Sequence, residues 1–259
     1  MASRVARSQL AMATGARKTI VVGTLVLALL SVHGRAPSQP AGDSALAPFK
    51  AHFTAEWKSL SVGTSDIELK PDADAGPDAV AGRFIYTWSL SARGIFRLAY
   101  EDVNQKSWVS IEVAHVRPQK YHAIQGEAAV NIDFDWDAGH ARGVDDSKPV
   151  DVVLVAGTQD VMSIQLEVML GLKHGNLPKN FKILDKDEIK DFIYTQEPPA
   201  RIRTALGELD TLVVASQRNG SNRLLRMWFA PSLGYVPVQA ERTRDGKLEF
   251  AMRIETLQP

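Results

Sequence analysis

Hydrophobic and polar residues alternate with a period of two along several segments of this chain. Segment 49–58 places Phe, Ala, Phe, Ala and Trp on one side and Lys, His, Thr, Glu and Lys on the other. Segments 84–90 and 130–136 repeat the pattern. Successive side chains of a strand point to opposite faces, so each segment predicts a β-strand with one buried face and one wet face.

The last quarter of the chain predicts hairpins. Residues 209–216 and 225–229 alternate on either side of Asn219-Gly220, a turn dipeptide that tolerates positive φ at both central positions. Asp245-Gly246 marks a second turn, before the alternating segment 248–254. Four strands without an intervening helix are typical of an antiparallel meander.

Two prolines constrain this meander. Pro231 and Pro237 lack the backbone N–H that a sheet ladder uses. We therefore expect the strand that follows Tyr235 to begin at a sheet edge or after a bulge.

One segment breaks the alternation. Residues 159–173 are too densely apolar for one strand face, Thr158 can cap a helix start, and Gly175 can end it. We predict a helix at about 158–173 that is apolar around most of its circumference and must be covered on several sides. The predicted fold is mainly β (α+β), a strongly curved antiparallel sheet or half-barrel wrapped around this one main helix. Segment 95–100 gives a weaker helical signal.

The amino-terminal segment resembles an export signal. Four basic residues precede the apolar run 20–32, and no acidic residue occurs before Asp43. We predict a signal peptide at 1–34, a flexible Pro-rich linker at 35–48, a single β-rich domain at 49–259, and a periplasmic location. Translation from Met12 and an uncleaved inner-membrane anchor are the alternatives, although the apolar run is short for a span, which needs about 20 residues.

Charge and cysteine content narrow the options. The chain has 30 basic and 30 acidic residues; without residues 1–34, which hold four basic residues, the net charge is −4. A mildly acidic domain is a poor nucleic-acid binder. The chain contains no cysteine, so neither a disulfide nor cysteine lipidation can form. We expect a monomer.

Several short motifs together resemble one protein family. Thr204-Ala-Leu-Gly-Glu-Leu-Asp-Thr, Met227-Trp-Phe-Ala-Pro and Tyr235-Val-Pro-Val follow upstream motifs such as Phe134-Asp-Trp in the order typical of the bacterial domain of unknown function family 3108. The resemblance covers roughly residues 49 to 257. It implies an exported envelope protein with a half-barrel similar to lipoprotein localisation factors. It implies no catalytic residues.

Motifs for chemistry are missing. Asp133, Asp135 and Asp137 are spaced like calcium ligands, but Ala138 and Val144 occupy positions where a calcium loop has glycine and glutamate. We interpret these acids as the charged face of an edge strand. The histidines lack zinc spacing, and there is no serine elbow, phosphate loop or dinucleotide fingerprint. We predict no metal, no cofactor and no enzymatic activity.

Aromatic residues suggest a cavity or a packed core. The simpler interpretation is core packing for Trp57, Trp88 and Trp136. The functional interpretation is an apolar cavity between the sheet and its helix. The residues predicted to bind a ligand there are Phe53, Trp57, Phe84, Trp88, Trp136, Met162 and Met169. Trp108 and Trp228, which fall on the opposite strand faces, are predicted surface contacts.

Three hypotheses of function follow. The first is a periplasmic protein that binds or carries a hydrophobic or lipid ligand in envelope biogenesis. The second is an envelope assembly or scaffold protein with a filled core and a protein partner. The third is an enzyme whose site is assembled from residues distant in sequence. An open tunnel beside the helix would favour the first, and a filled core the second.

Overall fold

The computed structural model describes residues 46–75, 82–98 and 101–259. The predicted signal peptide and most of the predicted linker lie outside these residues. Within them, Leu46 is already buried in the hydrophobic core.

The first arm of the sheet is an antiparallel meander of eight strands among the described residues. The alternation of apolar and polar residues explains why these segments form strands. In β1, for example, every second residue from Phe49 to Ala55 is buried. Short 3₁₀ helices at Ala73–Ala75 and Gly94–Leu98 follow β2 and β3, so the weak helical signal at 95–100 corresponds to a 3₁₀ turn. The strands are β1 (Phe49–Trp57), β2 (Leu60–Pro71), β3 (Arg83–Ala92), β4 (Val103–Ile111), β5 (Val116–Gln125), β6 (Ala128–Asp135), β7 (His140–Asp145) and β8 (Lys148–Val153).

The second arm contains the remaining described strands and returns to the first. A short strand, β9, pairs in parallel with β10, and every later neighbour is antiparallel. The strands are β9 (Gln159–Asp160), β10 (Asn180–Asp185), β11 (Glu188–Thr204), β12 (Gly207–Arg218), β13 (Arg223–Ala230), β14 (Val236–Arg244) and β15 (Lys247–Gln258).

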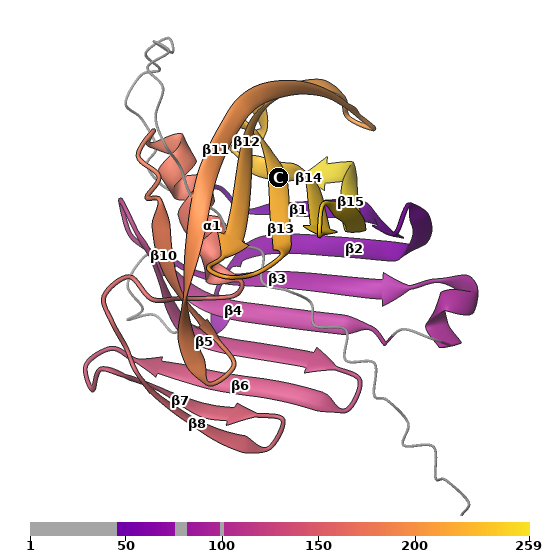
Figure 1. Cartoon of the computed structure of the whole chain (residues 1–259). Coiled ribbons are helices and arrows are strands. Elements are labelled where there is room, and N and C mark those ends of the chain that lie inside the picture. The colour runs from indigo at the N-terminus through magenta and orange to yellow at the C-terminus, as the bar shows by residue number, and fades with distance from the viewer. Residues whose placement is uncertain (1–45, 76–81, 99–100) are drawn as a thin grey trace, which may run out of the picture.

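The two arms join through their first and last strands. β15 pairs with β1, which places β1 in the middle of one curved sheet whose order runs from β8 to β1 and then from β15 back to β9. In Figure 1, β1 to β8 form one layer and the long strands β11 to β13 rise across it. The sheet is unclosed, with β8 and β9 at its ends. The predicted mainly β, strongly curved antiparallel sheet is confirmed at this level.

One α-helix, α1 (Ser163–Lys173), lies beside β5 and β9. Its side chains are buried from Ser163 to Leu170, which confirms a helix that is covered on several sides. The predicted start was wrong, because residues 159–160 form β9. The hydroxyl of Thr158 donates to the carbonyl of Val155 instead of capping the helix.

The N-cap residue of α1 is Met162, whose side chain makes no capping hydrogen bond, and the acceptor at the helix start is Asp160. Its Oδ1 accepts hydrogen bonds from the backbone N–H groups of Met162 (2.6 Å) and Ser163 (2.8 Å). At the other end, the predicted stop is confirmed: Gly175 has φ of 65°, and its N–H donates to Leu172.

The predicted meander of the last quarter is confirmed, with one changed turn. At Asp245-Gly246 both residues have positive φ, as the sequence predicted. The connection between β12 and β13 spans four residues, and of Asn219-Gly220 only the glycine has positive φ. Trp228 pairs with Gln239 and Phe229 with Pro237, so Val238 is the extra residue of a bulge on β14, which explains how proline fits into this interior strand.

The prediction of an acidic edge strand was wrong. β6, which carries Asp133 and Asp135, is an interior strand between β5 and β7. Lys120 on β5 lies 3.4 Å from Asp133, and Asp135 accepts a hydrogen bond from the N–H of Ala138. These carboxylates therefore lie on the solvent-exposed face of an interior strand and have partners there. The alternation within 130–136 could not show that a further strand, β7, pairs with this segment.

Candidate functional site

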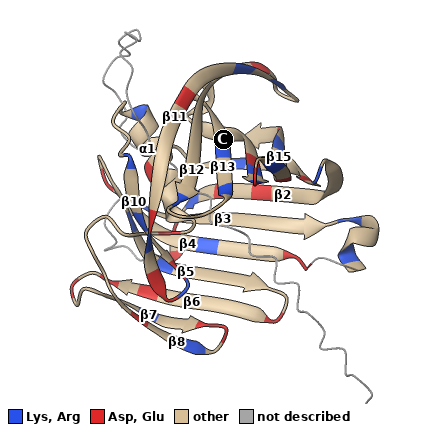
Figure 2. Cartoon of the chain, in the orientation of Figure 1, with Lys and Arg blue, Asp and Glu red and all other residues tan. Residues whose placement is uncertain are grey.

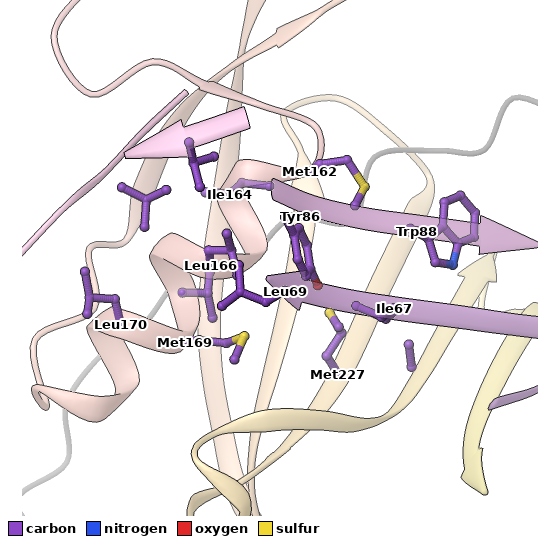
Figure 3. Close-up of a cluster of buried hydrophobic side chains, with 14 of the residues drawn as sticks. Ile67, Leu69, Tyr86, Trp88, Met162, Ile164, Leu166, Met169, Leu170 and Met227 are labelled. Carbon is purple, nitrogen blue, oxygen red and sulfur yellow. The ribbon is translucent and has the colours of Figure 1, made fainter. Parts of the chain in front are cut away.

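An apolar cavity lies between the two arms and the start of α1. The first arm contributes Phe53, Ile67 and Trp88, the segment before α1 contributes Met162, and the second arm contributes Met227 and Met252. Figure 3 shows Ile67, Trp88, Met162 and Met227 on facing elements. Apart from Met162, each of these side chains comes from the buried face of its strand, so the same alternation that builds the core also builds most of the cavity.

The cavity is small in this structure. Its volume is about 60 Å³. An engineered protein cavity that binds benzene measures about 150 Å³, and pockets for larger ligands about 300–1,000 Å³. Leu166, Met169 and Leu170 of α1 are almost inaccessible to solvent. Three of the eleven apolar lining residues are methionines, which are unbranched and adapt to different shapes.

Polar groups reach the cavity at separate points. Gln165 is buried on α1, and its Nε2 has no hydrogen-bond partner among the described residues. Arg242 lines the cavity from β14, and its guanidinium lies 6.0 Å from the ring centre of Trp57 and 5.8 Å from that of Phe250. A buried amide donor without an acceptor costs free energy, which a water molecule or a ligand oxygen in the cavity would recover.

Arg242 belongs to an arginine cluster that surrounds one carboxylate. Its Nε donates to Glu249 Oε2 at 3.0 Å, and the Nε atoms of Arg223 and Arg244 lie 3.5 and 3.8 Å from the Glu249 carboxylate. Only 8% of the Arg242 side chain is exposed. Burial lowers the pKa of Arg242, and the attraction of Glu249 opposes that shift.

The residues predicted to bind a ligand fall into separate places. Phe53, Trp88 and Met162 line the cavity. Trp57 is half-buried beneath the guanidinium of Arg242. Phe84 is half-buried against the core, and Met169 is fully buried within it, so neither lines the cavity.

The third tryptophan predicted to bind a ligand lies in a different place. Trp136 lines a separate cleft of about 530 Å³ beside β5 and α1, where its Nε1 donates to Pro118 at 2.7 Å. Arg117 lies over its ring at 5.2 Å. We refer to this second space as the histidine cleft.

The histidine cleft contains a buried carboxylate. Glu167 on α1 accepts a hydrogen bond from the Val116 N–H at 2.5 Å and lies 3.3 Å from Nδ1 of His115, whose side chain is exposed. Burial raises the pKa of Glu167, while the Val116 N–H and His115 act in the opposite direction. Nearby, Gln159 donates to the Val116 carbonyl at 2.7 Å, but its Oε1 has no partner among the described residues.

The two predicted surface tryptophans are half-buried. The Nζ atoms of Lys106 and Lys120 lie 5.1 and 6.0 Å from the ring centre of Trp108. Trp228 packs partly against the core, between Val213 on β12 and Gln239 on β14. Neither ring stands fully exposed.

Sequence reasoning missed the polar groups of both sites. Arg242 follows Val236, Val238 and Ala240 with a period of two, which places it on the buried face of β14. Gln165 and Glu167 interrupt an otherwise apolar helix. A charged or amide residue at a position that the apolar pattern assigns to the core was the signal that could have identified them.

Two further observations concern metals and membranes. Over residues 46–75, 82–98 and 101–259, no group of three or more His, Cys, Asp and Glu side chains could hold a metal ion. Within the same ranges, no helix is long and apolar enough to cross a membrane.

Comparison with known proteins identifies a family and a fold. The family model described as "Protein of unknown function (DUF3108)" matches residues 52–253. A search of curated proteins finds no match. The crystal structure of a β-barrel-like protein of domain of unknown function DUF1849 from Brucella abortus is similar, with a TM-score of 0.55 at 10% identity, covering 82% of this chain and 98% of that one.

A second, less similar structure is that of a protein described as exported. A protein from Bacteroides fragilis described as exported, with a YmcC-like fold, aligns over 82% of this chain and 95% of its own, with 8% identity and a TM-score of 0.36. At such low identities the Brucella structure supports the fold alone, and the Bacteroides match supports no argument.

Proposed function

Because the chain belongs to the DUF3108 family, whose function is not known, we propose a function from its geometry: an exported envelope protein that binds a hydrophobic small molecule in the apolar cavity. In this proposal the sheet curls around α1, and the ligand lies between the helix start and the two arms. The basic, then apolar, amino-terminal sequence supports export.

The observation that carries the proposal is the composition of the cavity. Eleven of the fifteen lining residues are apolar, they come from both arms and the segment before α1, and Gln165, whose Nε2 has no partner among the described residues, is one of the four polar ones. A mostly apolar pocket with a few placed polar groups is the usual form of a small-molecule site. The volume of about 60 Å³ means that the methionine side chains must move before an alkyl chain can enter.

A cavity-filling substitution tests the proposal. Ala240 lines the cavity and is 4% exposed, so Ala240→Leu would occupy part of its volume. We expect the wild-type protein to bind 1-octanol by calorimetry, and Ala240→Leu to bind it at least tenfold more weakly. Its melting temperature should stay within a few degrees, because the added atoms enter existing space. Ala129→Leu, on the exposed surface of β6, is the matched control and should bind like the wild type.

Two results would contradict this proposal. One is the absence of binding of 1-octanol at millimolar concentration, together with no enriched lipid in an organic extract of the purified protein. The other is undiminished binding by Ala240→Leu. Either result would favour the scaffold hypothesis, in which a filled core supports a surface that includes Trp108 and Trp228.

The histidine cleft favours a second candidate, an enzyme. Glu167 and His115 bring two titratable groups together in a cleft of about 530 Å³, and a carboxyl group with a raised pKa is suited to acid or base catalysis near neutral pH. Hydrolysis of p-nitrophenyl acetate by the wild type and by Glu167→Gln would test it. Equal rates in the two proteins would remove this candidate.

A further inference from the structure

A second space adjoins the apolar cavity. It has a volume of about 270 Å³ and lies where the β10–β11 turn, the β12–β13 connection and β14 come together. Leu225 and Arg242 line both this space and the apolar cavity. The two spaces are therefore neighbours that share these two side chains as a wall. We refer to the second space as the arginine cleft.

Basic side chains dominate the arginine cleft. Its lining contains five basic residues, Lys186, Lys190, Arg218, Arg223 and Arg242, and one acidic residue, Asp185. The chain as a whole has equal numbers of basic and acidic residues, so this excess is local. Figure 2 shows basic segments at the end of the sheet where β12 and β13 are connected.

The nearby carboxylates do not neutralise this excess. Lys190 is compensated, because its Nζ lies 3.0 Å from Asp185 and 3.0 Å from Glu188. Glu249, in contrast, is a single carboxylate among three guanidinium groups, those of Arg223, Arg242 and Arg244. One negative charge against three positive charges leaves the arginine cluster with a net charge of about +2, since arginine stays protonated in proteins.

One donor of the cluster lacks an acceptor. The Nε atom of Arg223 is buried and makes no hydrogen bond with any described residue, although Glu249 lies 3.5 Å away. Guanidinium groups donate from a planar fork that matches the oxygens of carboxylate and phosphate. An anionic oxygen in the cleft would satisfy this N–H and also balance the local charge.

We propose that the arginine cleft binds the carboxylate or phosphate group of an amphipathic ligand whose hydrocarbon part occupies the apolar cavity. This inference rests on the proposed function, since it requires that the cavity accept an alkyl chain. The wall shared by Leu225 and Arg242 places the charged part of such a ligand next to its apolar part.

Calorimetry with three probes tests the inference: octyl phosphate, 1-octanol and inorganic phosphate. In 50 mM salt, we expect octyl phosphate to bind the wild-type protein at least tenfold more tightly than 1-octanol. Raising the salt to 500 mM should reduce this difference, because salt screens charge interactions at a partly exposed site. Inorganic phosphate alone should bind much more weakly than octyl phosphate.

Substitutions separate the charged and apolar contributions. Arg223→Gln should weaken the binding of octyl phosphate about tenfold and leave the affinity for 1-octanol unchanged. Arg203→Gln is the matched control, because Arg203 is an 85% exposed arginine on β11 that pairs with Glu208 outside the cleft. It should change neither affinity.

The outcomes distinguish the anion site in the arginine cleft from the proposed binding of a hydrophobic ligand in the apolar cavity. Equal binding of octyl phosphate and 1-octanol overturns the anionic site and leaves the proposed function standing. Failure of both to bind overturns both. Inorganic phosphate that binds as tightly as octyl phosphate, with loss in Arg223→Gln, overturns the amphipathic ligand and assigns the cleft to a free anion. An unchanged octyl phosphate affinity in Arg223→Gln contradicts the role of the cleft.

Discussion

The start of α1 and the arginine cluster both bring charged groups into the interior, but they differ in how those groups are satisfied. At the helix start, the Asp160 carboxylate receives hydrogen bonds from the Ser107 hydroxyl at 2.6 Å and from the N–H groups of Met162 and Ser163. In the arginine cluster, one carboxylate serves three guanidinium groups, and the Arg223 Nε has no hydrogen-bond partner among the described residues. A satisfied group of this kind holds the fold together, whereas an unsatisfied one marks where a ligand can bind.

The largest expected effect is the loss of stability when the Asp160 carboxylate is removed. Asp160→Ala leaves two buried N–H groups and a hydroxyl without their acceptor and should destabilise the protein by about 3–5 kcal/mol. Urea unfolding monitored by tryptophan fluorescence would measure this loss. Asp160→Asn, which keeps one oxygen acceptor, is the matched variant and should lose less. A loss below about 1 kcal/mol for Asp160→Ala would contradict a structural role for this group.

A methionine pair sharpens the distinction between core and cavity. Met169 is fully buried in the hydrophobic core, while Met162 lines the apolar cavity. Met169→Ala should cost about 2–4 kcal/mol, because it creates a new void. Met162→Ala enlarges an existing space and should cost roughly half as much, while it changes the affinity for 1-octanol. Equal losses of stability with no change in binding would mean that Met162 is an ordinary core residue.

The smallest effect concerns the histidine cleft and depends on pH. Because burial raises the pKa of Glu167 above its usual value of 4.5, the folded protein holds this proton more tightly than the unfolded chain. Its contribution to stability is therefore present below pH 4.5 and is lost as the pH rises through the folded pKa. Glu167→Gln keeps an acceptor for the Val116 N–H and should be about 1 kcal/mol more stable than the wild type at pH 7, but not at pH 4.

Thermal unfolding at a series of pH values would measure this difference. Nδ1 of His115 lies 3.3 Å from the Glu167 carboxylate, so the comparison should be repeated in a His115→Gln background. A stability difference that stays constant with pH in both backgrounds would contradict the assignment to Glu167.

Local patterns predicted β1, β3, β6 and the strands of the last quarter, the curvature, and the position of α1 within a few residues, but they did not identify β2, β5, β7, β8, β10 or β11. They could not predict that β6 is an interior strand of the sheet, because a strand with one solvent-exposed face has the same alternating sequence whether it pairs with one neighbouring strand or two. They also placed the helix start too early, because Gln159 and Asp160 pair with β10 as the strand β9 and the helix begins only at Ser163.

The candidate site was predictable in its apolar half. Phe53 and Trp88 line the cavity because alternation assigns both to the buried faces of their strands, and Met162 belongs to the densely apolar segment that was predicted to be helical. Arg242 and Arg223 converge with Glu249 only after β13, β14 and β15 have paired. Long-range pairing of this kind leaves no local trace in the sequence.

The pairing of β1 with β15 determines when this fold can be completed. Each arm is built largely from neighbouring hairpins, which form quickly because their loops are short. The bond from the Thr54 hydroxyl to the Arg253 carbonyl, in contrast, joins residues 199 positions apart. Until the last strand has been synthesised, β1 has one neighbour and presents an open edge to other chains. The centre of the sheet is therefore the last part to be protected from aggregation during folding, although it is the best protected part of the finished protein.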